Sequence, residues 1–331
     1  MKPIQTIGIL GGGAWATALA QAMHMAHKKV IMFARNEKVV RDINDTHINS
    51  HYLPAVHIDA SITASSDVSG LRHCDSVLLA VPAQFIRAEC ERIKTRVSIS
   101  ASLIICAKGI ESNTGKLMAD VVKEIFGDNP ICVLSGPTFA KEVAQGKPTA
   151  VTIAADTLDF AKQLCEQLSS HYFRPYASAD IIGVELAGAL KNVIAIGCGM
   201  VIGKHLGENA RTAFMTRGLR EMTRLAVALG GKQETLMGLA GLGDLVLTCG
   251  STQSRNMSLG MALGGGERLE TILKNRVSVA EGVSTSLAAQ LLAKKYHVDT
   301  PIIDAVVSVL HHNADIGAMM EQLLSRPLTT E

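Results

Sequence analysis

The stretch IGILGGGAWATALAQAM at residues 7–23 decides the first part of the fold. Its apolar opening is typical of a buried strand, and it leads into Gly11, Gly13 and Ala16 at the positions of the G-x-G-x-x-G/A pattern. The glycines allow a tight turn and the close approach of a pyrophosphate, while Ala16 lets the next helix pack closely on the strand. Backbone N–H groups at the start of that helix favour phosphate binding. This order predicts a dinucleotide-binding βαβ unit.

Short apolar runs alternate with helical stretches from the N-terminus to about residue 180. We expect strands at 4–10, 29–34, 76–81, 103–107, 131–135 and 150–154, and helices at 14–26, 37–48, 84–95, 114–126 and 157–168. Fully apolar strands that alternate with helices predict a mostly parallel sheet covered on both faces.

Long helical patterns replace the strand pattern after about residue 180. They cover 181–203, 208–229, 254–263, 281–296 and 301–311. The sequence therefore predicts an α/β N-terminal Rossmann-like domain over residues 1–180 and an all-α C-terminal domain over residues 181–331.

The end of the second expected strand indicates which dinucleotide binds. NAD sites usually place Asp or Glu there, about 20 residues after the glycine turn, to bind the ribose 2′-hydroxyl. Here the chain reads IMFARNE, with Arg35 and no acid before Glu37. A guanidinium matches the geometry of a 2′-phosphate. We therefore expect NADP(H) as cofactor, with NAD(H) as an alternative, while a surface charge at a strand end remains the other interpretation of Arg35.

The composition excludes several classes of partner. Lys plus Arg exceed Asp plus Glu by two, which gives no field strong enough for nucleic acid or an anionic membrane. Eleven residues separate Asn192 from Lys204 in the most apolar stretch, short of the ~20 that a bilayer needs, so no membrane span is expected. Four glycines in GILGGG likewise disfavour a secretory signal.

Seven cysteines are scattered along the chain, and no pair has the C-x-x-C spacing of a zinc or redox site. We expect them to be reduced and mostly buried in a cytoplasmic protein. Histidine pairs at 24/27 and 47/51 have helical spacing but no H-E-x-x-H pattern, so no metal site is expected.

Several longer blocks occur in order between about residues 4 and 310. They include GGGAWATALA (11–20), AKGIE (107–111), LSGPTFAKEVAQGKPTA (134–150), GVELAGALKNVIAI (183–196), AGLGDLVLTC (240–249) and STQSRN (251–256). Through these blocks the chain resembles the bacterial NAD(P)-dependent glycerol-3-phosphate dehydrogenase family. The resemblance implies a helical domain of the 6-phosphogluconate dehydrogenase C-terminal type. It also implies reversible hydride transfer between NAD(P)H and dihydroxyacetone phosphate, which gives sn-glycerol 3-phosphate for phospholipid synthesis.

The resemblance also assigns roles to individual residues. It makes Lys191 the catalytic acid/base. The implied substrate contacts are Lys108, Gly136, Thr138, Lys191, Asn192, Asp244, Ser254, Arg255 and Asn256. The implied cofactor site comprises Gly11, Gly13, Ala14, Trp15, Arg35, Lys108, Ala140, Arg255, Val279 and Glu281. A homodimer is left open as the assembly. Gly250 departs from the family pattern, where a bulkier residue is usual, and would loosen the loop before Ser254.

The residues themselves support a proton-transfer role for Lys191. Reduction of a ketone by hydride makes an alkoxide, so the site needs a proton donor within hydrogen-bond reach of that oxygen. Lys191 and Asn192 interrupt an almost wholly apolar helix, although lysine is rarely buried without a partner. The other interpretation is a lysine whose stem covers apolar surface while its ammonium reaches water. Asp244 would either orient Lys191 or bind a substrate hydroxyl, and the sequence leaves both open.

Two other basic or polar positions have a simple alternative interpretation. Ser254 would cap the helix that follows, and the same helix start together with Arg255 would hold a phosphate. Lys108 lies just beyond a strand's carboxyl end, where open α/β sheets bind ligands, but a surface charge would also fit there.

Two rival functions share these features. One is a related β-hydroxyacid or sugar-acid dehydrogenase, against which Arg255, Asn256 and AGLGDL favour a phosphorylated three-carbon substrate. The other is a catalytically silent dinucleotide-binding regulator, which would not need Lys191 or Lys108.

Overall fold

The apolar runs of the first half form one eight-stranded sheet in the computed structural model, which describes residues 2–275 and 280–327. Its strand order is β10-β9-β8-β7-β6-β1-β2-β5. The strands are β1 (Thr6–Leu10), β2 (Lys29–Phe33), β5 (Thr63–Ser65), β6 (Ser76–Leu79), β7 (Ser102–Ile105), β8 (Ile131–Ser135), β9 (Thr149–Ala155) and β10 (Phe173–Ser178). Neighbouring strands are parallel except β8 and β9, which pair antiparallel. The prediction of a mostly parallel sheet is confirmed.

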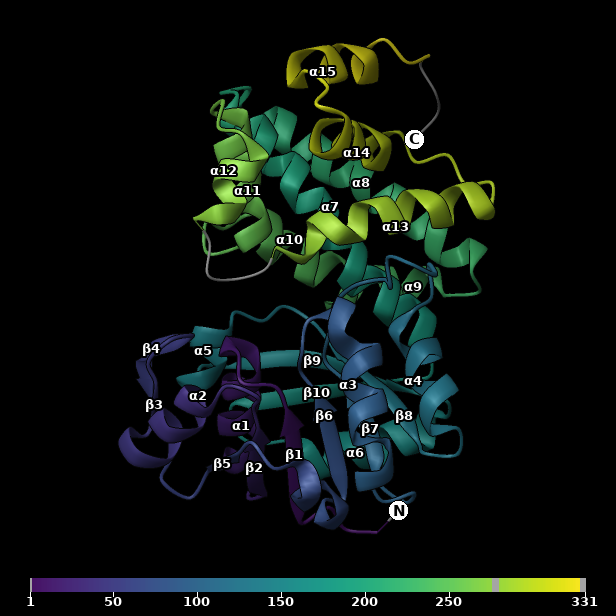
Figure 1. Cartoon of the computed structure of the whole chain (residues 1–331). Helices are drawn as coiled ribbons and strands as arrows, with labels where there is room; N and C mark the ends of the chain where they lie inside the picture. The colour runs from purple at the N-terminus through teal and green to yellow at the C-terminus, as the bar shows by residue number, and fades with distance from the viewer. Residues whose placement is uncertain (1, 276–279, 328–331) are drawn as a thin grey trace. The chain divides into compact units, whose positions relative to one another are not determined.

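Helices follow the strands and pack along the sheet (Figure 1). They are α1 (Ala14–Met25), α2 (Glu37–Arg41), α3 (Ile86–Ile93), α4 (Met118–Phe126), α5 (Ala140–Ala144) and α6 (Leu158–Leu168). Short 3-10 helices lie at Val68–His73, Ala83–Phe85 and Lys94–Arg96, and β3 (Ile48–Asn49) pairs with β4 (Leu53–His57) as a separate hairpin. The order β2-β1-β6 puts the glycine turn after β1 at the point where the direction of strand progression reverses, which is where open α/β sheets bind ligands.

Two of the expected helices are wrong in extent. The helix expected at 37–48 ends at Arg41 and continues as a π-helical turn to Thr46, after which His47 adopts a left-handed conformation with φ of 55°. The helix expected at 114–126 begins at Met118, because Gly115 has φ of 69°, which a right-handed helix cannot contain.

After β10, the described residues are mainly helical. Its elements are α7 (Ile181–Gly203), α8 (Gly207–Ala228), α9 (Gln233–Leu236), a π-helical turn (Leu239–Gly243), α10 (Asp244–Cys249), α11 (Arg255–Gly264), α12 (Leu269–Lys274), α13 (Glu281–Lys295), α14 (Pro301–His312) and α15 (Ile316–Leu324). The chain forms two compact units, one made of residues 1–108 and 116–185 and the other of residues 109–115 and 186–331.

Helix α7 is the central element of the helical unit. By length and composition it could cross a membrane, with a mean hydropathy of 1.7, yet 89% of this apolar window is buried inside the protein. Burial on this scale identifies it as a core helix.

Glycines set the spacing between α7 and α11. A Cβ atom on Gly260 would lie 1.9 Å from the carbonyl oxygen of Ile196, and one on Gly199 would lie 2.2 Å from that of Met257. Gly203 and Gly264 make a second such pair one turn further along. The two helices therefore meet backbone to backbone, which explains why the sequence of α7 is rich in small residues.

Two buried carboxylates hold helix N-termini. Glu185 accepts the backbone N–H of Ala119 at 2.8 Å in the first turn of α4, and burial raises the pKa of this carboxyl to about 8. Glu221 on α8 accepts the N–H groups of Ile302 and Ile303 at 2.8 and 3.1 Å, and burial raises its pKa to about 7. Each acid satisfies N–H groups that a helix start leaves without an intrahelical partner.

Candidate functional site

The glycine turn after β1 has the geometry that a dinucleotide requires. Gly11 has φ of 137°, and a Cβ atom there would lie 2.8 Å from the carbonyl oxygen of Ala80, so only glycine fits. Gly13 is the N-cap of α1 and makes no side-chain cap bond, and a Cβ atom there would meet nothing within 4 Å. Ala14 and Trp15 open the helix, whose first turn carries no acid, and the buried Trp15 Nε1 has no hydrogen-bond partner. Open space beside helix N–H groups, together with a buried indole donor, fits a bound pyrophosphate.

Two other predicted cofactor residues follow strands of the sheet, and the rest lie in the helical unit. Arg35 lies two residues beyond β2, with 68% of its side chain exposed, and its Nη1 is 3.2 Å from Oε1 of Glu89. Ala140 begins α5. In the helical unit, Glu281 begins α13 and Arg255 begins α11, whereas Val279 lies outside the described residues.

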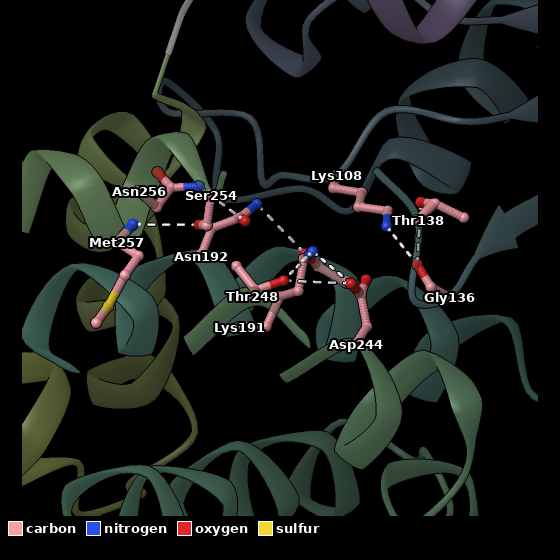
Figure 2. Close-up of polar contacts among 11 residues, drawn as sticks. Lys108, Gly136, Thr138, Lys191, Asn192, Asp244, Thr248, Ser254, Asn256 and Met257 are labelled. Carbon is pink, nitrogen blue, oxygen red and sulfur yellow. Dashed lines mark hydrogen bonds and ion pairs between the residues drawn. The ribbon is translucent and has the colours of Figure 1, made fainter. Parts of the chain in front are cut away.

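Lys108, Gly136 and Thr138 meet at one carbonyl oxygen. Lys108 Nζ donates to the oxygen of Gly136 at 2.9 Å, and Thr138 Oγ1 donates to the same oxygen at 3.2 Å (Figure 2). Gly136 follows β8 with φ of 148°, and a Cβ atom there would lie 2.9 Å from Cα of Val151. The structure thus brings these three predicted substrate contacts together and fixes Lys108 through backbone that only glycine can adopt.

Lys191 points to a carboxylate rather than to bulk solvent. Its Nζ donates to Oδ1 of Asp244 at 2.6 Å and to Oγ1 of Thr248 at 2.8 Å (Figure 2). The side chain of Lys191 is 7% exposed and that of Asp244 is fully buried. Asp244 opens α10, and Thr248 lies one turn later with its hydroxyl 3.3 Å from Oδ1 of Asp244. Removal of one partner from such a buried pair typically costs about 3–5 kcal/mol.

The sequence left open whether Asp244 orients Lys191 or binds a substrate hydroxyl. In the structure, Asp244 contacts the Lys191 ammonium, as the first alternative requires. Thr248 was missed by sequence reasoning. Its spacing of four residues from Asp244 on a helix could have indicated it, since such residues share a face.

Asn192, the residue after Lys191, belongs to a second series of hydrogen bonds. Asn256 Nδ2 donates to Oδ1 of Asn192 at 2.9 Å, and Oδ1 of Asn256 accepts the backbone N–H of Gly282 at 3.1 Å. A Cβ atom on Gly282 would lie 2.6 Å from the carbonyl oxygen of Asn192, so α13 starts in close contact with α7. These amides connect the starts of α11 and α13 to the middle of α7.

Ser254 caps α11 as the sequence predicts. Its side chain accepts the N–H of Met257 at 3.2 Å (Figure 2). The preceding loop is secured by Arg211, whose Nη1 donates to the carbonyl oxygen of Cys249 at 2.9 Å while its Nε donates to Glu208 at 2.7 Å. A guanidinium on the last carbonyls of α10 is favourable for both charge and hydrogen bonding, and it restrains the loop that contains Gly250.

The cysteines are all buried, and none forms a disulfide. The Cys198 thiol beside it, together with burial, raises the pKa of the Cys249 thiol well above its ordinary value. Such thiols are unreactive. Across the described part of the chain, no group of three or more His, Cys, Asp or Glu residues could hold a metal ion.

Comparison with known proteins decides the family. The model of the NAD-dependent glycerol-3-phosphate dehydrogenase N-terminus matches residues 6–161, and that of the C-terminus matches residues 180–321. The chain belongs to the glycerol-3-phosphate dehydrogenase family.

Individual members of the glycerol-3-phosphate dehydrogenase family match this chain over nearly its whole length. The chain is 48% identical over 329 residues to the glycerol-3-phosphate dehydrogenase [NAD(P)+] of Rhodospirillum rubrum, covering 99% of this chain and 94% of the relative. It is 47% identical to that of Caulobacter vibrioides, covering 99% of both. The crystal structure of glycerol-3-phosphate dehydrogenase from Coxiella burnetii matches with a TM-score of 0.93 at 37% identity, covering 98% of this chain and 99% of that one.

Proposed function

We propose that the chain catalyses the reversible reduction of dihydroxyacetone phosphate to sn-glycerol 3-phosphate, with Lys191 as the acid/base residue. As a member of its family, the chain is an NAD(P)-dependent oxidoreductase that acts on a CH–OH group. Its product supplies glycerophospholipid synthesis. The observation that carries the proposal is the Lys191 ammonium, fixed by Asp244 and Thr248 in an otherwise apolar helix.

In this proposal, both domains contribute residues that bind the cofactor. Residues 1–180 bind the cofactor through Gly11, Gly13, Ala14, Trp15, Arg35, Lys108 and Ala140, and residues 181–331 supply the other proposed cofactor contacts at Arg255, Val279 and Glu281. The nicotinamide cofactor, when bound, supplies or accepts the hydride. The exposed guanidinium of Arg35 at the end of β2 supports NADP(H) as the preferred cofactor and leaves NAD(H) usable.

Lys191 performs the proton transfer in this proposal. In reduction, its ammonium protonates the developing alkoxide, which must lie within hydrogen-bond reach of Nζ. In oxidation, the neutral amine accepts the proton of the substrate hydroxyl. Raised pH should therefore favour oxidation more strongly than reduction, and initial rates in both directions across pH 6–9 measure this difference.

The phosphate group is proposed to bind where cationic and helix-start donors gather. Arg255 and the first N–H groups of α11 provide such donors, and Ser254, Asn256 and Asn192 shape that end of the site. Lys108, Gly136 and Thr138 are proposed to contact the substrate from the first domain.

A spectrophotometric assay tests the proposal directly. Oxidation of NADPH and of NADH is followed with dihydroxyacetone phosphate and with unphosphorylated dihydroxyacetone. Lys191→Ala should abolish most turnover at every pH, and turnover within a few-fold of the wild type would refute its role. Arg255→Ala should raise KM for dihydroxyacetone phosphate much more than KM for dihydroxyacetone, whereas equal effects would argue against phosphate binding.

The location and assembly of the protein are also proposals. Seven buried cysteines without a disulfide support a reducing compartment, and thus the cytoplasm. A homodimer is the proposed assembly, which light scattering coupled to size-exclusion chromatography would test.

A further inference from the structure

Two arginines from different parts of the first unit share one buried carboxylate. Glu89 lies on α3, and its side chain is 5% exposed. Its Oε1 contacts Nη1 of Arg35 at 3.2 Å. Its Oε2 accepts Nε and Nη2 of Arg92 at 3.0 and 2.7 Å. The carboxylate therefore brings two guanidinium groups to the same place.

One member of this cluster, Arg35, lies at the end of the second strand, the position that faces the adenosine ribose in Rossmann-type sheets. Arg35 follows β2, and α3 follows β6, the two strands that flank β1 in the sheet. In Rossmann-type sheets, the residue at the end of the second strand faces the ribose 2′ position. Glu89 therefore joins Arg92 to the residue at that position, although nothing in the local sequence of Arg92 indicates a ligand.

The exposed fractions of the three side chains indicate which side of the cluster is open to a ligand. The side chains of Arg35 and Arg92 are 68% and 36% exposed, while the carboxylate that joins them is buried. The cluster keeps a net charge of +1, so an anion gains from binding at its open side. Phosphate and carboxylate oxygens accept guanidinium N–H groups in the same paired geometry. Because both guanidinium groups contact the same carboxylate, a phosphate bound at the open side of the cluster would lie near both of them.

We propose that Arg92 is a second ligand of the 2′-phosphate of NADP(H), acting together with Arg35. This inference rests on the proposed function, in which Arg35 is the first such ligand. It assigns the discrimination between NADP(H) and NAD(H) to a pair of arginines rather than to Arg35 alone.

Calorimetric titration with adenosine 2′,5′-bisphosphate and with NADH tests the inference without turnover. Arg92→Gln should weaken binding of adenosine 2′,5′-bisphosphate about tenfold, the loss typical of one charge-assisted contact. Binding of NADH, which has no 2′-phosphate, should stay within twofold. The ratio of kcat/KM for NADPH to that for NADH should fall by the same factor.

Arg87→Gln is the matched control, because Arg87 lies on the same helix and pairs with Glu124 at 2.9 Å instead of with Glu89. It should leave both affinities unchanged. If Arg92→Gln weakens neither ligand, or weakens both equally, the inference is overturned. Arg35→Ala separates this failure from that of the proposed cofactor preference: a selective loss with Arg35→Ala but not with Arg92→Gln would refute only the role of Arg92.

Discussion

The buried carboxyl of Glu221 should make the stability of the helical unit depend on pH. Burial raises its pKa from 4.5 to about 7 in the folded protein, although the two N–H bonds from Ile302 and Ile303 oppose the shift. Between these two pH values the folded protein binds a proton that the unfolded chain has lost. Its contribution to stability is therefore fully present below pH 4.5 and is lost as pH rises through about 7.

The size of the effect follows from the shift. At 1.36 kcal/mol for each pH unit, the full contribution is about 3 kcal/mol, and about 2.5 kcal/mol of it disappears between pH 5 and pH 8. Glu221→Gln keeps the shape and one acceptor oxygen for the start of α14 but cannot titrate. The free energy of unfolding of the wild type should thus fall by about 2.5 kcal/mol relative to the variant over this range.

Urea unfolding of both proteins at pH 5, 6, 7 and 8 measures this difference, and the other titrating groups, Glu185 included, cancel in the comparison. Amide hydrogen exchange at Ile302 and Ile303 reports on the same helix start independently. A difference between the two proteins that stays constant from pH 5 to pH 8 would refute the reasoning.

Three further outcomes follow from particular contacts. Thr248→Val removes a hydroxyl at 2.8 Å from Lys191 Nζ, so kcat should fall about tenfold while KM for dihydroxyacetone phosphate changes less than twofold; an unchanged kcat in initial-rate assays would contradict this. Gly260→Ala should destabilise the protein by about 2–3 kcal/mol because its Cβ would overlap the Ile196 carbonyl, whereas Gly238→Ala, with its nearest atom 3.4 Å away, is the matched control in thermal unfolding. His205 follows α7 in a left-handed conformation with φ of 58°, in a turn where the N–H of Leu206 donates to the carbonyl oxygen of Val201. Glycine adopts this conformation without strain, so His205→Gly should stabilise the protein by about 0.5–1 kcal/mol and raise Tm in thermal unfolding. A lower Tm would count against this reasoning.

Sequence patterns predicted the parts of the fold that depend on local periodicity. The long helix at 181–203 and the strands β1, β2, β6, β7, β8 and β9 were predicted from apolar runs, because burial imposes those runs directly, whereas the order of the strands in the sheet came from the structure. The strand β10 was missed because it contains Pro175 and alternates buried with exposed residues, a pattern that an edge strand tolerates. Short helices such as α5 and α9 are stabilised by tertiary packing and leave little periodic signal.

In the candidate site, too, some features could be predicted from the sequence and others depend on tertiary packing. Lys191 was conspicuous because a charge in an apolar helix violates the usual pattern of burial. Its contact with Thr248 and the meeting of Arg35 with Arg92 at Glu89 depend on how distant segments pack, which the sequence does not display.

The glycine contacts between α7 and α11 have a consequence for substrate range. Lys191 lies on one of these helices, and Ser254 and Arg255 lie at the start of the other. Main-chain atoms of α7 and α11 are in direct contact, with no layer of side chains between them. Substitution of side chains therefore cannot change the distance between the two helices. In the proposed function, Lys191 donates the proton and Arg255 binds the phosphate, so this packing fixes the distance between the two roles. A phosphorylated ketone with one more carbon should then be a poor substrate because its carbonyl and phosphate do not match that distance.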